Sequence, residues 1–175
     1  EVMGRHAGWI ATHTGIAGGA DVVLIPEIPI DLDEMCDILK KRHSRGRTFS
    51  IVVVAEGAQV KKSDVTKDQS LDDFGHVKLG GIGDFLAKEI EKRTGYETRV
   101  SVLGHIQRGG SPTAFDRVLG TRFGVKAVEL AENKEFGKMV SLSGTKIIAV
   151  PLEMDVSKLK TVDMELYDIA KVFFG

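Results

Sequence analysis

Side chains suited to binding an anionic, hydroxylated ligand gather at a few places in this sequence. Met3-Gly4-Arg5 precedes a predicted helix, so Gly4 can expose backbone amides and Arg5 can lie across a phosphate. The segment VLGHIQRGGSP sets His105 and Arg108 between a predicted strand and a helix. Arginine has a planar fork of donors that matches phosphate, and histidine adds a donor or a partial charge. The pattern favours an anion site, and a Gly-rich turn with a solvated arginine is the open alternative.

Two further charged residues stand on or after predicted strands. Glu56 ends an apolar strand, where a carboxylate caps the fold, accepts hydrogen bonds from a polyol, or acts as a catalytic base. Arg99 stands on the polar face of a segment that alternates over residues 97–102. A surface salt bridge from Arg99 to Glu97 or Glu91 is the competing interpretation.

Composition limits the classes of protein that this chain can represent. Its 175 residues are 42% hydrophobic and 28% charged, with a net charge of -1, which indicates about one globular domain. The balance of charges argues against nucleic-acid partners, and the absence of a long apolar run argues against a membrane span. The single cysteine, Cys36, excludes an internal disulfide and favours a cytoplasmic location. The five histidines are scattered, so we expect no metal site.

The elements needed to position these residues alternate along the chain. Residues 22–25 and 50–55 are apolar runs typical of parallel strands, and helices are predicted over 6–17, 31–43 and 82–94. Gly18-Gly19 would stop the first helix, and Asp31 or Asp33 would cap the second. This order predicts an α/β three-layer sandwich, with a largely parallel sheet flanked by helices. Ligands of such sheets bind beyond the carboxyl ends of the strands, here residues 26–27, 56–57 and 104–110. Further predictions are a mobile surface loop over 58–78, a strand over 97–102, strands over 138–142 and 147–150, and a helix over 163–172. Ser111 would cap a further helix that runs to about residue 131, with an apolar stripe of Phe115, Leu119, Phe123 and Ala127.

Three separated motifs together resemble one enzyme family. EVMGRHAGW, AEGA and ETRVSVLGHIQRGGSPTAFDR resemble 6-phosphofructokinases of the bacterial, actinobacterial type, specifically their C-terminal sugar-phosphate-binding portion. The resemblance implies a phosphofructokinase-like fold, incomplete here, and phosphoryl transfer to the 1-hydroxyl of fructose 6-phosphate in glycolysis. The residues that it implies for substrate binding are Met3, Gly4, Arg5, Glu56, Arg99, His105, Ile106, Gln107 and Arg108.

The resemblance also implies which parts of the enzyme stand outside this chain. Arg5 would steady the transferring phosphoryl group, whereas the family's donor loop and catalytic aspartate precede Met-Gly-Arg. The chain starts at Glu1 without an initiator Met, so we expect a strand to be missing upstream. Family members use ATP or pyrophosphate with Mg²⁺, and the donor stays open because the discriminating residues are in the absent part.

Domain roles, regulation and assembly follow from the same resemblance. Residues 1–108 would form the incomplete fructose 6-phosphate domain, 109–150 would return to the missing donor domain, and 151–175 would be a C-terminal tail. Family members are usually homotetramers, so we expect identical subunits that share a site across an interface. An allosteric effector pocket would involve Asp21, Arg45 and Arg47, for which a solvated turn is the alternative. A non-catalytic sugar-phosphate-binding or sensing module is the competing function.

Overall fold

The chain forms two compact units in the computed structural model, which describes residues 1–61, 81–155 and 158–174. One unit comprises Glu1–Arg108 together with Lys160–Gly175, and the other comprises Gly109–Leu159. The predicted roles of 1–108, 109–150 and 151–175 stay predictions. The structure groups the residues from 160 onward with the first unit.

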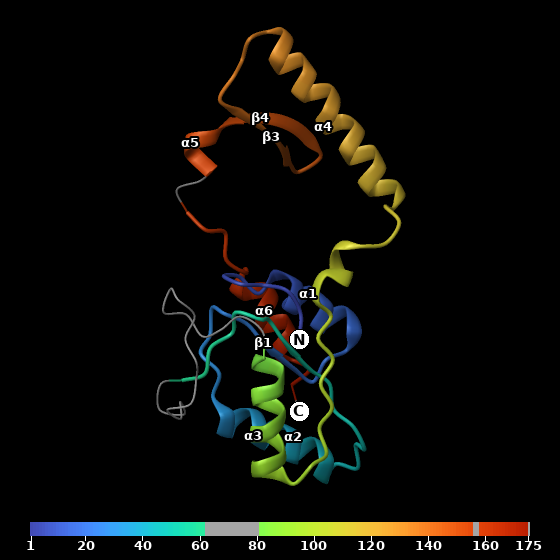
Figure 1. The fold of residues 1–175 in the computed structure, drawn as a ribbon, viewed down its shortest axis with the longest axis vertical. Helices are drawn as coiled ribbons and strands as arrows, with labels where there is room; N and C mark the ends of the chain where they lie inside the picture. Colours follow the sequence, from blue (N-terminus) through green and yellow to red (C-terminus); the bar gives the residue numbers. More distant parts are fainter. Residues whose placement is uncertain (62–80, 156–157, 175) are drawn as a thin grey trace. The chain divides into compact units, whose positions relative to one another are not determined.

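A parallel sheet forms the centre of the first unit (Figure 1). Strand β1 (Val22–Leu24) pairs in parallel with β2 (Val52–Val54), in the register Val22 to Val52. Val2 makes a further parallel bridge to Ala55. The prediction of parallel strands from unbroken β-branched runs is therefore confirmed.

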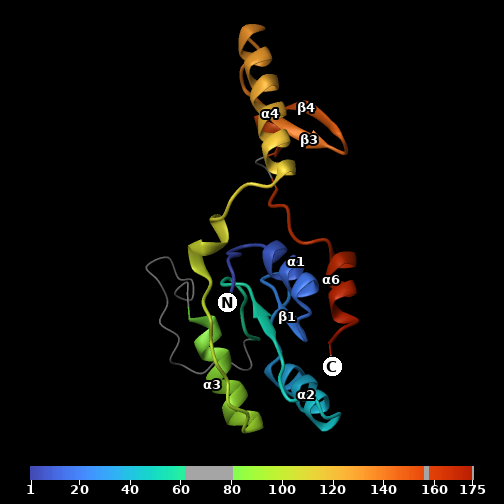
Figure 2. The same cartoon turned by 90° about the vertical axis from the view of Figure 1, so that its right-hand side faces the viewer.

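Side chains of the two strands alternate between two hydrophobic layers. Val23 of β1 and the neighbouring Ile25 pack with Tyr167, on the side of helices α1 and α6. Figure 2 shows α1 and α6 together on one side of the strands, with α2 and α3 on the other. The helices on the Val23 side are α1 (Trp9–Gly18) and α6 (Met164–Lys171). The three-layer arrangement follows from this alternation, because each face of the sheet must bury apolar side chains.

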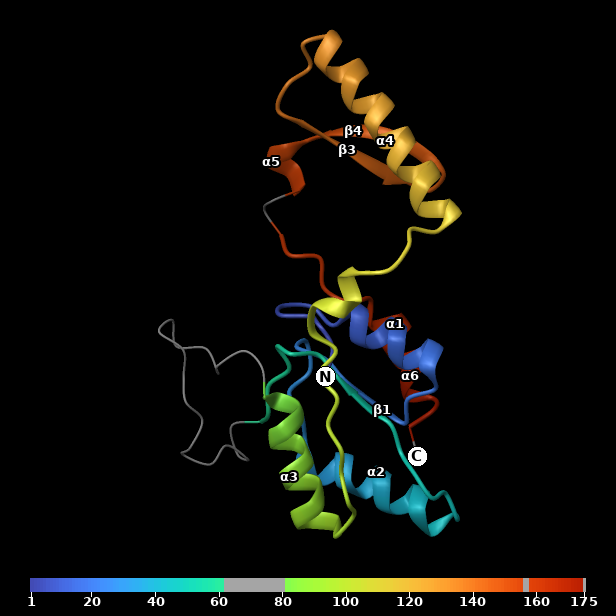
Figure 3. The ribbon, with the colours of Figure 1, turned by 45° about the vertical axis from the view of Figure 1, so that its right-hand side comes forward.

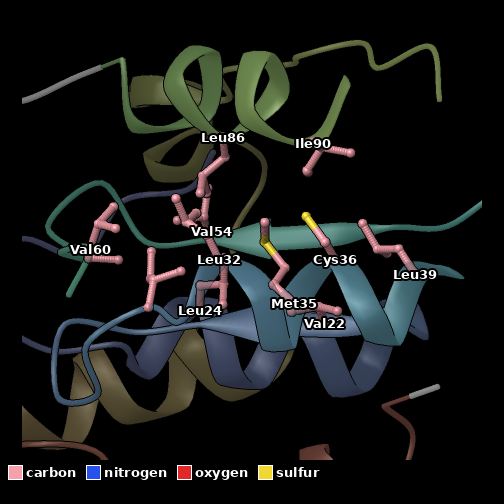
Figure 4. Close-up of a cluster of buried hydrophobic side chains, with 12 residues drawn as sticks. Val22, Leu24, Leu32, Met35, Cys36, Leu39, Val54, Val60, Leu86 and Ile90 are labelled. Carbon is pink, nitrogen blue, oxygen red and sulfur yellow. The ribbon is translucent and has the colours of Figure 1, made fainter. Parts of the chain in front are cut away.

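The opposite layer is the larger hydrophobic cluster. Figure 4 shows Leu86 and Ile90 of α3 pointing toward Val54 of β2 and toward the apolar side chains of α2. Helix α2 contributes Leu32, Met35, Cys36 and Leu39. The two helices are α2 (Leu32–Ser44) and α3 (Ile82–Thr94). Burial raises the pKa of the Cys36 thiol, as expected of a cysteine that serves packing.

Local signals in the sequence set the helix ends. Helix α1 ends at Gly19, whose φ of 66° is left-handed. The Asp31 carboxylate caps α2 by accepting from Glu34 N, and this hydrogen bond, with the nearby Lys61, lowers the pKa of Asp31. These predicted ends are confirmed.

The predicted strand over residues 97–102 is wrong for the described chain. This segment runs back beside α3 in an extended course but carries no strand (Figure 3). Among the described residues, its backbone pairs only at its end, with Glu1: Glu1 N donates to Ser101 O at 2.8 Å, and Leu103 N, just past the segment, donates to Glu1 O at 3.0 Å. A strand needs a partner along its length, and this segment has one at a single point.

The second unit contains a long helix and a hairpin. The hairpin is confirmed, but the helix is capped by Thr113, which shares a capping box with Asp116, and not by Ser111 as predicted. The predicted apolar stripe is only partly buried, since Leu119 and Phe123 are half-buried while Phe115 is 66% exposed. The elements are α4 (Ala114–Glu132), β3 (Lys138–Ser143), β4 (Lys146–Pro151) and α5 (Leu152–Asp155).

The predicted surface loop over 58–78 begins inside the core. Ala58 and Val60 are buried, and Val60 bridges to Ile30, so the loop prediction is wrong for its first residues. Its remainder, residues 62–78, lies outside the described residues. Among the residues that the structure describes, no helix combines the length and apolar composition of a membrane span.

Candidate functional site

The loop at residues 3–5 lies against the end of β2. Glu56 N donates to Val2 O at 2.9 Å, and Gly57 N donates to Gly4 O at 3.0 Å. Gly4 N in turn donates to Oε1 of Glu56 at 3.3 Å. The parallel pairing of Val2 with Ala55 places both segments at the carboxyl edge of the sheet. Met3-Gly4-Arg5 and Glu56, which are distant in sequence, are therefore neighbours.

Two glycines permit this close approach. Gly4 has a φ of 143°, which residues with a Cβ rarely adopt, and a Cβ there would lie 2.8 Å from Ala7 O. A Cβ on Gly57 would lie 1.8 Å from Arg5 O. The sequence AEGA therefore carries a packing requirement as well as a carboxylate.

The 3-10 helix η2 (Gly104–Arg108) reaches the same place through Gln107. Oε1 of Gln107 accepts from Met3 N at 3.2 Å, and its Nε2 donates to Gly104 O at 2.9 Å. Gln107 therefore ties η2 to the Met3 loop, while Ile106 is 75% exposed. Sequence reasoning placed Gln107 in the site by resemblance and gave it no such positioning contact.

Three basic side chains stand on the segments that form this junction, and they have no partners within the described residues. Arg5, His105 and Arg108 are exposed, and within the described residues none of these side chains makes a hydrogen bond or an ion pair. Glu56 is half-buried, and its Oε2 accepts no hydrogen bond from that part of the chain. Free donors beside a free carboxylate oxygen suit a ligand that carries both an anionic group and hydroxyls.

Arg99 lies outside this group in the described chain. Its side chain is 87% exposed, and its guanidinium pairs with Oε1 of Glu97 at 2.9 Å. No contact joins Arg99 to residues 3–5, 56 or 105–108 among the interactions of the described residues. The competing surface salt bridge is thus present, and a role for Arg99 toward another subunit stays a prediction.

The residues predicted for an effector occupy a different end of the sheet. Asp21 is 6% exposed, and its oxygens accept from Ile51 N at 2.8 Å and pair with Arg42 at 3.0 Å. Arg45 is the C-cap residue of α2, and Arg47 is exposed. Asp21 therefore ties the starts of the two strands together, and its effector role is not tested by these contacts.

The predicted strand end at Glu27 has a structural role. Both oxygens of its carboxylate accept from Gly8 N, at 3.0 and 3.1 Å, and Oε1 also accepts from Val162 N at 2.9 Å. Glu27 thereby fixes the start of α1 to the segment that leads into α6. No local signal distinguishes Pro26-Glu27 from Ala55-Glu56, so the sequence did not predict that Glu27 is a structural acceptor.

The described residues offer no cluster of three or more His, Cys, Asp or Glu side chains that could hold a metal ion. We therefore assign no Mg²⁺ ligand to them.

Comparisons with known proteins agree with the motifs at this edge of the sheet. The family model described as "Phosphofructokinase" matches residues 1–131. Among curated proteins, the pyrophosphate–fructose 6-phosphate 1-phosphotransferase of Streptomyces coelicolor is 57% identical over 176 residues, covering 100% of this chain and 51% of that protein. The ATP-dependent 6-phosphofructokinase of Mycobacterium tuberculosis is 52% identical with the same coverage. The chain thus spans about half the length of the curated relatives that it matches.

Solved structures show the same similarity. A phosphofructokinase from Pichia pastoris in the T-state matches with a TM-score of 0.69 and 34% identity, over 98% of this chain and 18% of that one. A pyrophosphate-dependent phosphofructokinase from Marinobacter aquaeolei matches with a TM-score of 0.73 and 25% identity, over 94% and 41%. The predicted α/β class is confirmed, and the family match covers most of the sequence. The chain therefore belongs to the phosphofructokinase family.

Proposed function

We propose that the intact protein transfers a phosphoryl group to the 1-hydroxyl of fructose 6-phosphate, giving fructose 1,6-bisphosphate, and that this chain supplies the sugar-phosphate site. The observation that carries the proposal is the junction of residues 3–5, Glu56 and η2 at one edge of the sheet. It brings segments that carry unpaired basic side chains to a carboxylate with a free oxygen, as a phosphorylated polyol requires. The names of the relatives point to the same substrate.

Each residue has a chemical role in this proposal. Glu56 accepts hydrogen bonds from sugar hydroxyls, while His105 and Arg108 bind the 6-phosphate. Arg5 neutralises charge on the transferring phosphoryl group, because phosphoryl transfer depends on positioning and on electrostatic stabilisation. Met3, Gly4, Ile106 and Gln107 form the backbone of the site, and Gln107 positions it by accepting from Met3 N. The catalytic base and the donor loop belong to the part of the protein outside this chain.

The phosphoryl donor is ATP or pyrophosphate, accompanied by Mg²⁺. Relatives of nearly equal identity carry names with one donor or the other, so the similarity alone does not choose. Turnover of the intact protein with each donor, at matched Mg²⁺, identifies it. We also propose a cytoplasmic location, and an effector site at Asp21, Arg45 and Arg47 whose test is the response of turnover to nucleotides in an Arg47→Ala variant.

The test of function compares the intact protein with the 175-residue chain. We expect the intact protein to form fructose 1,6-bisphosphate and the chain alone to bind fructose 6-phosphate without turnover. Fructose is the matched control ligand, because it lacks the phosphate that His105 and Arg108 bind. Turnover by the purified chain alone would contradict the assignment of the base and donor loop. Binding without turnover by the intact protein, with either donor, would favour the sensing module.

We further propose that the site is shared between identical subunits of a homotetramer. Arg99 is exposed and lies apart from the junction, so it is free to reach the phosphate bound by a neighbouring subunit. Intact Arg99→Ala and Arg108→Ala variants should each bind fructose 6-phosphate weakly. Mixed and reassembled, they should regain part of the activity, because some interfaces then contain both arginines. No recovery despite proven hybrid formation would place Arg99 outside a shared site.

A further inference from the structure

The side chain of Arg5, which the proposed function assigns to the transferring phosphoryl group, is held in place only through its backbone. Among the described residues, this side chain makes no hydrogen bond or ion pair. The Arg5 carbonyl instead packs against Gly57, where a Cβ would lie 1.8 Å from Arg5 O. A side chain without partners is placed reproducibly only if the backbone that carries it is fixed. The anchors of the loop of residues 3–8 therefore decide where Arg5 lies.

Hydrogen bonds anchor the loop of residues 3–8 at both of its ends. Two anchors, at the first two residues of the loop, belong to the junction described above. The third anchor is at the far end, where both oxygens of the Glu27 carboxylate accept from Gly8 N, at 3.0 and 3.1 Å. Arg5 lies between the second anchor and the third. A shift of Gly8 therefore moves the backbone that carries the Arg5 side chain.

Gly8 depends on an acceptor from another element. It is the N-cap residue of α1, has no side chain with which to cap the helix, and is followed by a first turn without acidic residues. A Cβ at this position would lie 2.3 Å from Cγ2 of Ile25, so a residue with a capping side chain does not fit there. The Glu27 carboxylate supplies both the missing acceptor and a negative charge at the start of the helix.

The segment of residues 160–162 lies against the same helix start. Val162 N donates to Oε1 of Glu27 at 2.9 Å, and the Val162 side chain is buried. Nε1 of Trp9 donates to Lys160 O at 2.9 Å, and the Lys160 ammonium lies 5.5 Å from the centroid of the Trp9 ring. Residues 160–162 therefore hold both the Glu27 carboxylate and the first residue of α1.

We propose that Glu27 is a positioning residue for phosphoryl transfer, and that residues 160–162 hold it in that role. By fixing Gly8, the Glu27 carboxylate fixes the loop that carries Arg5, and it does so from outside the residues proposed to bind substrate. The inference rests on the proposed function, because it uses the charge-neutralising role of Arg5. Loss of this anchor should slow transfer more than it weakens binding of fructose 6-phosphate, because the groups proposed for the sugar phosphate stand after β2 and on η2.

The first test measures steady-state turnover by the intact Glu27→Gln protein. The amide keeps the size of the side chain but turns an N–H group toward one of the two backbone donors. We expect kcat to fall about tenfold, with KM for fructose 6-phosphate within about threefold of its original value. Tyr167→Phe is the matched control, because it removes a buried hydrogen bond between α6 and β1 and leaves the start of α1 untouched. Equal kcat of the two variants would overturn the proposal.

A double-mutant cycle with Arg5→Ala separates positioning from general damage to the fold. If Glu27 acts through Arg5, Glu27→Gln should have no further effect on kcat once the Arg5 side chain is removed, and multiplication of the two losses would contradict the proposal. Trp9→Phe gives a second route if Glu27→Gln does not fold, since it removes only the bond to Lys160 O. It should lower kcat about threefold, and an unchanged kcat would count against the role of residues 160–162.

Amide hydrogen exchange of the intact protein tests the anchor without relying on activity. Met3 N and Gly4 N, resolved by fragmentation in the mass spectrometer, should exchange about tenfold faster in Glu27→Gln than in Tyr167→Phe. Equal exchange in the two variants would show that Glu27 does not hold the loop. If the unmodified intact protein turned over with neither donor, the proposed function would fail, and the exchange result alone would then decide whether Glu27 anchors the loop that carries Arg5.

Discussion

The segments that follow β1 and β2 each contain a glutamate, but the two carboxylates have different hydrogen-bond partners. Each apolar strand is followed by a carboxylate, Glu27 after β1 and Glu56 after β2. The Glu27 carboxylate accepts from Gly8 N and Val162 N, so both of its oxygens are engaged. The Glu56 carboxylate accepts one longer bond, of 3.3 Å, from Gly4 N. One carboxylate therefore holds the fold together, and the other keeps an oxygen available for a ligand.

The surroundings of each carboxylate explain the difference. Glu27 faces the start of α1, where Gly8 packs so closely that a Cβ would lie 2.3 Å from Cγ2 of Ile25. The amide of Gly8 is buried there and needs an acceptor. Glu56 instead lies against the exposed loop of residues 3–5, and Gly4 N is the one backbone donor from which it accepts among the described residues. The position of a carboxylate at a strand end therefore does not show that it is functional. Its role depends on which backbone N–H donors lie within hydrogen-bonding distance of it.

The largest expected effect is on the end of β2, from Gly57→Ala. The added Cβ would meet the backbone carbonyl of Arg5 at 1.8 Å, and backbone cannot move aside as a flexible side chain can. We expect a loss of about 3 kcal/mol in the free energy of unfolding, measured by urea denaturation of this chain. Gly18→Ala is the control, because a Cβ there meets nothing within 4 Å. Equal stability of the two variants would show that the Arg5 loop is not packed against Gly57.

Glu27→Ala should rank second and should act on stability. It leaves the buried Gly8 N and the Val162 N without an acceptor, so we expect a loss of about 2 kcal/mol in the free energy of unfolding. The control is Glu97→Gln, since within the described residues Glu97 pairs only with Arg99, on the surface. If Glu27→Ala unfolds at the same urea concentration as the unmodified chain, the distinction between the two strand ends fails.

Glu56→Gln, in contrast to Glu27→Ala, should weaken substrate binding and leave the free energy of unfolding nearly unchanged. Its single longer bond predicts a change in stability within about 0.5 kcal/mol. In the intact enzyme, loss of charge-assisted bonds to sugar hydroxyls should raise KM for fructose 6-phosphate about tenfold, with KM for the donor unchanged. Loss of kcat at constant KM would instead identify Glu56 as a base.

The smallest effect concerns Tyr167, which anchors α6 to the β1 side. Its hydroxyl donates to Val23 O at 3.0 Å, so Tyr167→Phe should lower the free energy of unfolding by about 1 kcal/mol near pH 8. Burial, with the nearby charges of Glu34 and Asp168, raises the pKa of Tyr167 to about 12. The unfolded chain loses this proton at a lower pH than the folded chain does, so the contribution to stability is lost as pH rises from about 10 to about 12. Urea denaturation over this interval should show the gap between the two proteins narrowing, and a constant gap would contradict it.

Much of the first unit could be predicted from local patterns. The stop of α1 at Gly19, the cap of α2 at Asp31 and the parallel pairing of two β-branched runs are all confirmed. These features depend on residues close in sequence or on burial of both faces of a strand. The strand over 97–102 could not be judged in this way, because alternation along a segment does not supply a pairing partner, and among the described residues its backbone pairs with Glu1 alone.

The sequence by itself determined the candidate residues of the site, since Met3-Gly4-Arg5, Glu56 and the segment from His105 to Arg108 stand out by type and spacing. Only the tertiary structure decided which of them meet, that Gln107 holds Met3 N, and that Arg99 lies apart with Glu97. It also decided that Glu27 is a structural acceptor while Glu56 is available. The physical reason is that local propensity fixes where a strand ends, whereas the donors around a strand end come from segments distant in sequence, here residues 3–8, 104–107 and 162.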